Sequence, residues 1–380
     1  MGDIVLSIII KLGIGILNII FALFKLLPVQ NKITYISRQM NTTPDDFQRL
    51  YDYNQFNHPE IRQVILAKMI PDGKIKKIGY CFHMITQMYH IATSKVIVLD
   101  TYCIPVSILH QRKSLVVIQI WHALGAFKKF GYSVLDTKEG RSSKTAKLMH
   151  MHENYTYVLT SSEHCLPYFQ QAFNVRRDQM KIYPLPRLDL FFDQDYKNKT
   201  IQKIYTQYPI LKDTNKKIIV YSPTFRRDSD DLLIEGIHQF IDELSDEYMI
   251  VLKKHPISKF KINDDRIIED ESFDSMSMYL IADYIVTDYS AGMYEASLIN
   301  KPIYFYAFDY KDYVVSRDFY EPYEKLVPGT IAYNAKELHK ALHSDQDALN
   351  RVSEFSKTMI QPFKKSYTED LGEFIYSQIK

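Results

Sequence analysis

Four apolar runs in this 380-residue sequence are each followed directly by side chains that suit phosphate binding or proton transfer. Short apolar runs of this kind are typical of buried strands. In an open parallel sheet the carboxyl ends of the strands lie along one edge, and ligands bind there. We therefore interpret the side chains after these runs as a candidate site. In chain order they are His122, Thr224, Arg226, His255, Asp288 and Ser290.

Two of these side chains have chemistry that fits an anionic ligand. The Arg226 guanidinium can bind two phosphate oxygens at once. His255 follows two lysines, which makes it a poor metal ligand but a suitable phosphate partner or acid. The alternative for His255 is a purely structural histidine. Asp288 could bind a ribose or orient a basic side chain.

The loop after the run "DYIVT" leads into a helix that is expected to start near Met293. The free N–H groups at the start of a helix attract anions. Ser290 adds a hydroxyl, and Ala291 and Gly292 let a ligand approach the backbone closely. The alternative for Ser290 is a simple helix cap, and the alternative for Glu295 is a solvated side chain.

Strands that alternate with helices must position these residues. The segment "IRQVILAKMI" has helical periodicity, and "HMITQMYHIATS" is expected to form a second helix. This alternation predicts parallel βαβ units. We predict an α/β fold with two doubly wound, Rossmann-like domains over residues 29–200 and 201–380. The expected strands include "KITYISRQ", "KVIVLD", "SLVVIQIWH", "KKIIVYSPTF" and "YMIVLKKHP".

Residues 1–28 are expected to form a hydrophobic helix that ends at Pro28. Lys11, Asn18 and Lys25 are spaced by seven, so they lie along one narrow stripe of that helix. A helix over residues 4–27 is about 36 Å long, which is enough to cross a bilayer. The polar stripe favours a helix that lies in the membrane interface. A spanning helix and a core helix of a soluble fold are the alternatives.

Composition excludes several classes of protein. The chain is 46% hydrophobic and 24% charged with a net charge of +2, which disfavours a dedicated nucleic-acid binder. Cys81, Cys103 and Cys165 have no CxxC spacing, so neither a disulfide framework nor a zinc site is expected. The sequence has no HExxH, no phosphate loop of the GxxxxGK[ST] type and no GxGxxG. We therefore expect no metal and no organic cofactor.

Six motifs in order carry a resemblance to a known family. They are "IWHALGAFKKFGY", "PLPRLDLFF", "YSPTFR", "LKKHP", "VTDYSAGMYEASLINKPIYFYAFDY" and "FYEPYEKLVPG". Over roughly residues 75–365 the chain resembles the CDP-glycerol glycerophosphotransferases of teichoic acid synthesis. It departs from the usual pattern at Ala123 and Pro184, where glycine is common in the family. The resemblance implies a GT-B architecture, a nucleotide donor held by the second domain, no catalytic metal, and peripheral attachment to the cytoplasmic side of the cell membrane.

The resemblance also implies roles for the site residues. His122 and His255 are the expected catalytic residues, with His122 as the general base. Thr224, Arg226 and Ser290, together with the Ala291–Gly292 backbone, would hold the CDP-glycerol diphosphate, and Asp288 and Glu295 would place the donor. Lys128 and Lys129 would meet the diphosphate of the acceptor; their alternative is a solvated loop pair.

The expected reaction is the priming step of wall teichoic acid synthesis. Glycerol phosphate would pass from CDP-glycerol to the N-acetylmannosamine of an undecaprenyl-diphosphate-linked disaccharide with N-acetylglucosamine, and CMP would leave. Expected partners are the donor, this lipid-linked acceptor, the cytoplasmic membrane leaflet and other teichoic acid enzymes. The alternatives are a chain-extending glycerol- or ribitol-phosphate transferase, a GT-B glycosyltransferase that uses a UDP-sugar, and a non-catalytic membrane-peripheral homologue.

Overall fold

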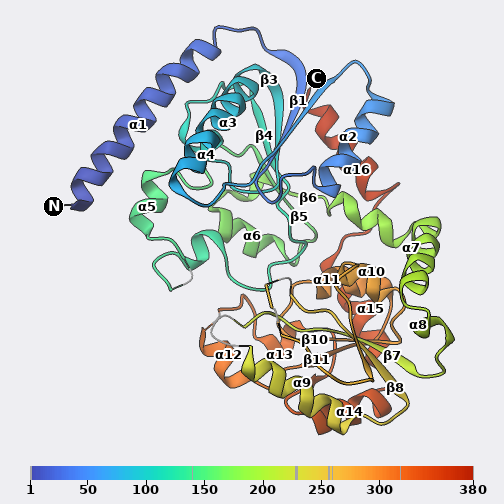
Figure 1. The fold of residues 1–380 in the computed structure, drawn as a ribbon. Coiled ribbons are helices and arrows are strands. Elements are labelled where there is room, and N and C mark those ends of the chain that lie inside the picture. The colour runs from blue at the N-terminus through green and yellow to red at the C-terminus, as the bar shows by residue number, and fades with distance from the viewer. Residues whose placement is uncertain are drawn as a thin grey trace. The chain divides into compact units, whose positions relative to one another are not determined.

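The computed structural model describes residues 2–138, 140–226, 230–255, 257–258, 260–316 and 318–379. The chain divides into two compact units (Figure 1). Unit 1 comprises Met1–Leu124, Lys129–Asp189 and Gln361–Lys380. Unit 2 comprises Gly125–Lys128 and Leu190–Ile360.

This division differs from the predicted boundary between residues 200 and 201. The C-terminal helix α16 (Tyr367–Ser377) packs on α2 (Asp45–Asn57) in unit 1. Gly372 of α16 faces the Tyr53 ring, and an added Cβ would fall 2.4 Å from that ring. The short segment Gly125–Lys128 belongs to unit 2, where Gly125 lies directly on the Tyr294 ring. Long-range packing of this kind leaves no local signal in the sequence.

Unit 1 is built on a six-stranded sheet with the order β2-β1-β3-β4-β5-β6, and every pair of neighbouring strands is parallel. The inner strands are buried on both faces, as expected for a parallel sheet covered by helices. The strands are β1 (Gln30–Ser37), β2 (Arg62–Ala67), β3 (Ser94–Leu99), β4 (Val116–Gln119), β5 (Tyr157–Thr160) and β6 (Met180–Ile182).

The prediction of a helix over residues 61–70 is wrong, because Arg62–Ala67 forms β2 at the edge of the sheet. The β-branched and apolar residues of this run pair in register with β1, from Lys32 opposite Arg62 to Ser37 opposite Ala67. A short apolar run fits both the helical and the strand periodicity of apolar residues. Pairing with β1 makes this run a strand. The remaining elements of unit 1 are α3 (Lys74–Thr93), α4 (Ile104–Ile108), α5 (Ser143–Leu148) and α6 (Leu166–Phe173), with the short 3-10 helices η1 (Gly131–Val134), η2 (Arg177–Gln179) and η3 (Pro186–Phe191), the last of which runs into unit 2.

Helix α1 (Gly2–Phe24) lies along unit 1 beside α3 (Figure 1). Its predicted polar stripe faces unit 1 at two of its three positions. The Asn18 amide donates to the carbonyl of Ile108 and accepts from the His110 backbone N–H, and Lys25 donates to the His110 carbonyl. Most of the large apolar side chains that are exposed near the start of the chain belong to α1, with Ile16 60% accessible, whereas Phe21 is buried. By length and composition, Val5–Phe24 is apolar enough to cross a membrane.

Unit 2 has a second six-stranded parallel sheet, with the order β12-β11-β10-β7-β8-β9. Both sheets confirm the predicted α/β class. The core of unit 2 is rich in aromatic rings, and Tyr221, Phe240 and Tyr306 pack within 6.2 Å of one another between ring centroids. The strands are β7 (Lys217–Ser222), β8 (Tyr248–Leu252), β9 (Ile267–Glu269), β10 (Tyr284–Thr287), β11 (Ile303–Tyr306) and β12 (Ile331–Ala332).

Helices connect the strands of unit 2 as expected for βαβ units, except that no helix lies between β8 and β9 in the described part of the chain. Helix α9 (Asp231–Glu243) packs on α14 (Ala335–Ser344), and both cover the hydrophobic core built on β7, β8, β10 and β11. The helices are α7 (Gln194–Gln207), α8 (Ile210–Asp213), α9 (Asp231–Glu243), α10 (Ser275–Tyr279), α11 (Met293–Ala296), α12 (Tyr310–Ser316), α13 (Tyr323–Leu326), α14 (Ala335–Ser344) and α15 (Ala348–Met359), with the 3-10 helix η4 (Ser297–Ile299).

Candidate active site

The strand order of unit 2 reverses between β7 and β10. Counted from β7, the order is 3-2-1-4-5-6, the dinucleotide-binding arrangement whose ligand crevice opens at this reversal. Thr224 follows β7 and Asp288 follows β10, and the two meet there. The Thr224 backbone N–H donates to Asp288 Oδ1 at 2.8 Å, and its hydroxyl donates to the same oxygen at 2.5 Å.

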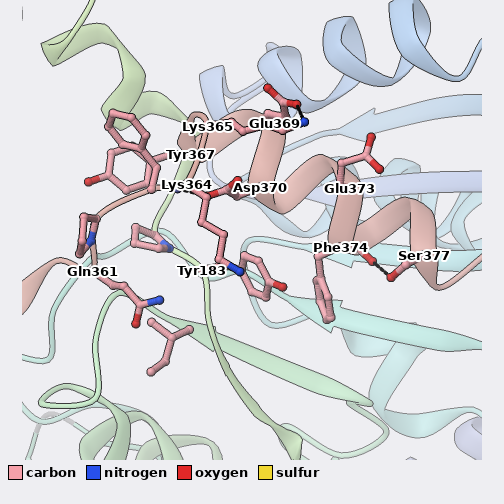
Figure 2. Close-up of a pocket in the computed structure, with 14 residues that line it drawn as sticks. Tyr183, Gln361, Lys364, Lys365, Tyr367, Glu369, Asp370, Glu373, Phe374 and Ser377 are labelled. Atoms are coloured by element: carbon pink, nitrogen blue, oxygen red, sulfur yellow. Dashed lines mark hydrogen bonds and ion pairs between the residues drawn. The ribbon is translucent and has the colours of Figure 1, made fainter.

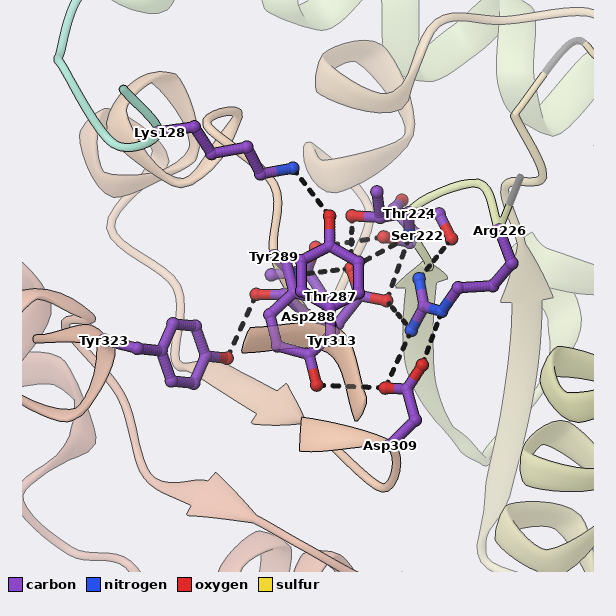
Figure 3. A network of polar contacts seen from close by, with 10 residues as sticks. All are labelled: Lys128, Ser222, Thr224, Arg226, Thr287, Asp288, Tyr289, Asp309, Tyr313 and Tyr323. Carbon is purple, nitrogen blue, oxygen red and sulfur yellow. Dashed lines mark hydrogen bonds and ion pairs between the residues drawn. The ribbon is translucent and has the colours of Figure 1, made fainter. Parts of the chain in front are cut away.

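Arg226 joins this pair through a buried network of charges (Figure 3). Its guanidinium Nη2 donates to Asp288 Oδ2 at 2.9 Å, and its Nε donates to Asp309 Oδ2 at 2.6 Å. The side chains of Arg226, Asp288 and Asp309 are only 8%, 0% and 5% exposed. Burial alone would lower the pKa of Arg226, but the two carboxylates outweigh it and raise that pKa.

Aromatic rings cover the network. The Tyr289 and Tyr313 rings stack with centroids 3.6 Å apart, and the Arg226 guanidinium lies 5.3 and 5.1 Å from them. The Tyr289 hydroxyl donates to Asp309 Oδ1 at 2.9 Å, and Tyr323 donates to the Asp288 carbonyl at 3.1 Å. Lys128 donates to the Tyr313 hydroxyl at 2.8 Å (Figure 3). These contacts hold the loops after β7, β10 and β11 in one arrangement.

The structure thus brings Thr224, Arg226 and Asp288 together, as the strand-end rule predicts. It also shows that the Arg226 guanidinium binds two carboxylates of its own unit, so its contact with a donor phosphate stays a prediction. Asp309 was missed by the sequence analysis. It follows β11 by three residues, so the same strand-end rule, applied to "PIYFYAFD", could have found it.

The loop after Asp288 is more open than the charge network. Ser290 and Gly292 are partly exposed and Ala291 is exposed. The Ser290 hydroxyl accepts from the Gly292 backbone N–H at 3.1 Å, which is a local turn and not a helix cap. Helix α11 starts at Met293 as predicted but has only four residues, so the anion site expected at its start stays a prediction. Glu295 lies on α11 and is partly buried.

His255 is exposed and follows β8. The Ile257 backbone N–H donates to its Nδ1 at 3.3 Å, which leaves Nε2 to carry the proton of the neutral ring. The preceding lysines are occupied, because Lys253 pairs with Asp270 at 2.6 Å and Lys254 with Glu269 at 2.5 Å. His255 is therefore a hydrogen-bond donor at the sheet edge; Pro256 of the same motif lies outside the described residues.

In unit 1, β4 ends in a strained turn that presents His122. Trp121 has a left-handed backbone with φ of 57°, which is rare for a bulky residue and is found where a site constrains the chain. The His122 Nδ1 lies 2.9 Å from the Asp100 carbonyl oxygen. A carbonyl can only accept, so Nδ1 carries the proton and Nε2 keeps a free lone pair in the neutral ring.

Neighbouring groups hold His122 in this state. Burial lowers the pKa of His122, and the nearby Arg187 lowers it further, although the Asp100 hydrogen bond and Asp46 oppose them. Arg187 also donates to the His122 carbonyl at 3.0 Å and pairs with Asp46 at 2.5 Å. A neutral histidine with an available Nε2 has the properties of a general base. Arg187 and Asp46 were not predicted as part of this arrangement.

Lys128 and Lys129 are neighbours in the sequence but belong to different units. Lys128 is part of the unit 2 network, whereas Lys129 lies in unit 1 and lines a cavity of about 300 Å³ beside Trp121. Contact with the acceptor's diphosphate, the role predicted for both lysines, stays a prediction, and a substitution of Lys129 would test it most directly.

A larger cavity of about 430 Å³ lies in unit 1 beyond the end of β6 and is bordered by α16 (Figure 2). Its charged groups are largely paired with one another or with neighbours. Lys365 pairs with Glu369 at 2.5 Å, Asp370 accepts from the Lys364 backbone N–H, and Glu373 pairs with His58. The cavity contains none of the predicted site residues. In the described part of the chain, no three His, Cys, Asp or Glu side chains converge as a metal site.

Comparison with known proteins identifies the family. A family model described as CDP-glycerol:poly(glycerophosphate) glycerophosphotransferase matches residues 19–375. The chain belongs to this family. The teichoic acid ribitol-phosphate primase of Bacillus spizizenii is 33% identical over 93% of this chain and 92% of its own. The teichoic acid glycerol-phosphate primase of Bacillus subtilis is 30% identical over 67% of each chain.

The fold comparison agrees with this assignment. The structure of the wall teichoic acid polymerase TagF superimposes with a TM-score of 0.73 at 20% identity, covering 99% of this chain and 98% of that one. This likeness supports the predicted GT-B-like fold with two parallel sheets. The predicted family and enzyme class are confirmed: the chain is a CDP-alcohol phosphotransferase of teichoic acid synthesis.

Proposed function

We propose that this protein transfers a single alditol phosphate from a CDP-alditol to a lipid-linked saccharide and releases CMP, as a teichoic acid primase. The observation that carries the proposal is the match to the B. spizizenii ribitol-phosphate primase over nearly the full length of both chains. This match favours ribitol as the alditol. Glycerol, which the motifs led us to expect, is the second candidate, and the description of the family model supports it.

The proposed reaction is an in-line displacement at the alditol-bearing phosphorus. The acceptor hydroxyl forms the new O–P bond, the P–O bond to CMP breaks, and the hydroxyl proton passes to His122 Nε2. Phosphoryl transfers of this kind depend on positioning and charge neutralisation. His122 fits the base role because its Nδ1 is engaged by the Asp100 carbonyl.

Unit 2 is the proposed donor site. CDP-alditol would bind where the strand order reverses, with the backbone and hydroxyl of Ser290, together with Ala291 and Gly292, at the diphosphate. His255 would donate from Nε2 to the leaving CMP phosphate. Arg226 would act mainly by fixing Thr224 and Asp288, and Glu295 would contact the donor from α11.

We propose that no resident metal takes part. Of the acidic side chains assigned to the donor site and its network, Asp288 and Asp309 are both bound to Arg226. Oxygen ligands with free lone pairs are what a hard cation requires. Transfer activity that survives EDTA would agree with this, and strict dependence on added Mg²⁺ would contradict it.

Mass spectrometry of the product tests the proposed function. The purified protein is incubated with a lipid-diphosphate-linked disaccharide and either CDP-ribitol or CDP-glycerol. We expect one added unit with release of CMP, and faster transfer from CDP-ribitol. A ladder of added units would indicate a chain extender, and transfer only from a UDP-sugar would indicate a glycosyltransferase. No transfer from any donor would overturn the proposal.

We also propose that α1 attaches the protein to the cytoplasmic face of the membrane. Ile9, Ile16 and Leu23 recur every seven residues on α1 and are 59%, 60% and 62% exposed, so they form an apolar stripe that the protein does not cover. Each aspartate placed in such a stripe opposes lipid contact by about 2.5–3.5 kcal/mol at full depth. The double variant Ile9→Asp, Ile16→Asp should therefore move from liposome pellets to the supernatant.

The matched control is Phe56→Asp, which removes an 86% exposed aromatic side chain from α2. This variant should pellet with liposomes as the unchanged protein does. If the α1 double variant still pellets fully, α1 is not the anchor. Deletion of residues 1–28 should agree with the double variant.

A further inference from the structure

We propose that unit 1 contains an anion subsite, formed by Arg38, Lys129 and Arg141 around Tyr102 and Trp121, that binds a phosphate group of the acceptor. The inference deepens the proposed function and rests on it for the identity of the acceptor. The subsite includes the cavity of about 300 Å³ lined by Tyr102, Trp121, Lys129, Arg141 and His152, among others.

The position of the subsite follows from the topology of unit 1. Its strand order, β2-β1-β3-β4-β5-β6, reverses between β1 and β3. Ligand crevices in open parallel sheets form at this reversal, beyond the carboxyl ends of the strands. Arg38 directly follows β1, and Tyr102 follows β3 by three residues. The cluster thus lies at the strand-order reversal of the unit 1 sheet, and the Arg226 network lies at the corresponding reversal of the unit 2 sheet.

The charge of the subsite favours an anion. The guanidinium of Arg38 lies 5.4 Å from the centre of the Tyr102 ring, and that of Arg141 lies 5.6 Å from it. Among the residues that the structure describes, neither arginine forms an ion pair with a carboxylate, and none of those that line the cavity is acidic. His152 adds no charge, because burial and the two arginines lower its pKa to about 3.

An unsatisfied buried donor supports a ligand at this place. The Nε of Arg38 is buried and has no hydrogen-bond partner in the structure. Buried donors are nearly always paired, so this orphan, on an arginine that flanks the cavity-lining Tyr102 ring, indicates a missing acceptor. A phosphate oxygen is the acceptor that matches a guanidinium best.

The backbone around the cavity is strained in a way that fixed sites commonly show. Gly131 lines the cavity with φ of 58° and packs so closely on α6 that a Cβ would fall 2.3 Å from the Ala172 carbonyl oxygen. Several non-glycine residues between positions 121 and 154 also have a left-handed backbone. Those residues are Trp121, Asp136, His150, His152 and Asn154.

The subsite adjoins the proposed base through one aromatic ring. The Trp121 indole lines the cavity, and its centroid is 4.1 Å from that of the His122 ring. A phosphate held by Arg141 and Lys129 would place the attached saccharide beside His122. Two phosphates have this chemistry: the diphosphate of the lipid carrier, and the phosphodiester of an alditol phosphate that the acceptor already carries.

Intrinsic fluorescence tests the subsite directly, because Trp121 is the single tryptophan of the chain. Inorganic diphosphate and glycerol 3-phosphate are the probes. We expect saturable quenching in the unchanged protein and a dissociation constant raised about tenfold to a hundredfold in Arg141→Gln, the range for a lost charge-assisted hydrogen bond. Arg141→Lys should restore part of the affinity. Lys147→Gln removes an exposed lysine of α5 outside the cavity and should leave the affinity unchanged.

Steady-state kinetics with three acceptors identifies the phosphate. The acceptors are the disaccharide on a lipid diphosphate, its neutral alkyl glycoside, and that glycoside carrying one glycerol phosphate. Arg141→Gln should raise KM for phosphate-bearing acceptors and leave KM for the neutral glycoside and for CDP-alditol unchanged. Loss confined to the first acceptor assigns the lipid diphosphate, and loss confined to the third assigns the phosphodiester.

Two results would overturn the subsite. One is equal quenching in the unchanged protein and in Arg141→Gln. The other is an equal loss of activity with all three acceptors, which would make Arg141 a structural residue. The failure of the proposed function has a different signature: the unchanged protein would release no CMP from any pairing, while the fluorescence result would still decide whether the subsite exists.

Discussion

Replacement of His122 by alanine is expected to lower kcat for alditol phosphate transfer by roughly 100-fold to 10,000-fold, the usual contribution of a positioned general base. The reason is the Nε2 lone pair, which the Nδ1 hydrogen bond to the Asp100 carbonyl leaves available. Removing the ring leaves the acceptor hydroxyl without a proton acceptor. CMP release, followed by chromatography under single-turnover conditions, is the measurement.

His110→Ala is the matched control. His110 is exposed, and its contacts to α1 are made by its backbone N–H and carbonyl, so loss of the ring should leave kcat within twofold. The His122→Ala protein should bind CDP-alditol with unchanged affinity, because the proposed donor site lies in unit 2. Undiminished CMP release by a folded His122→Ala protein would remove His122 from the mechanism.

The pH profile offers an independent check on the same residue. Burial lowers the pKa of His122 below its ordinary value of 6.5. A base acts when deprotonated, so kcat should be retained at pH 6.5 and fall only as the pH drops below the lowered pKa. An acid limb centred above pH 6.5 would assign the base to another group.

Replacement of Arg226 by methionine is expected to destabilise the protein by about 3–5 kcal/mol, the usual effect of removing one partner of a buried ion pair. Asp288 and Asp309, 0% and 5% exposed, would be left with uncompensated charge. Arg226→Lys keeps the charge but cannot bridge both carboxylates, so it should fall between the methionine variant and the unchanged protein. Urea denaturation followed by circular dichroism measures the effect.

Lys217→Met provides the control for that experiment. Lys217 pairs with Asp283 at 3.8 Å on the surface of unit 2, where both side chains are well exposed, and such pairs contribute about 0–1 kcal/mol. Adding Asp309→Asn to Arg226→Met should recover part of the lost stability, because one buried charge is removed. If Arg226→Met is as stable as Lys217→Met, the network does not support unit 2.

Much of the site could be predicted because strand ends are a local signal. The runs before His122, Thr224, His255 and Asp288 each form a parallel strand that ends within a few residues of the predicted side chain. Composition and alternation were also sufficient for the α/β class, and the ordered motifs for the family. The same local rule would have reached Asp309 had it been applied after β11.

Local sequence pattern was insufficient to assign secondary structure where the helical and the strand periodicity fit the same residues. Arg62–Ala67 has apolar spacing that suits a helix, yet pairing with β1 makes it a strand. The stripe of α1 is a similar case. Its spacing is visible in the sequence, but whether Asn18 and Lys25 face lipid headgroups or the protein depended on the carbonyls that unit 1 offers them.

By itself the sequence determined the strand-end residues, the two parallel sheets and the family, because each is written in short runs of neighbouring residues. Only the tertiary structure decided how those residues are used. In the structure Arg226 pairs with Asp288 and Asp309, and Arg38 and Arg141 lie near the Tyr102 ring. Lys128 and Lys129 belong to different units, and residues 361–380 belong to unit 1. These partners are separated by tens to hundreds of residues, and contacts over such distances follow from packing and charge pairing, which no local periodicity records.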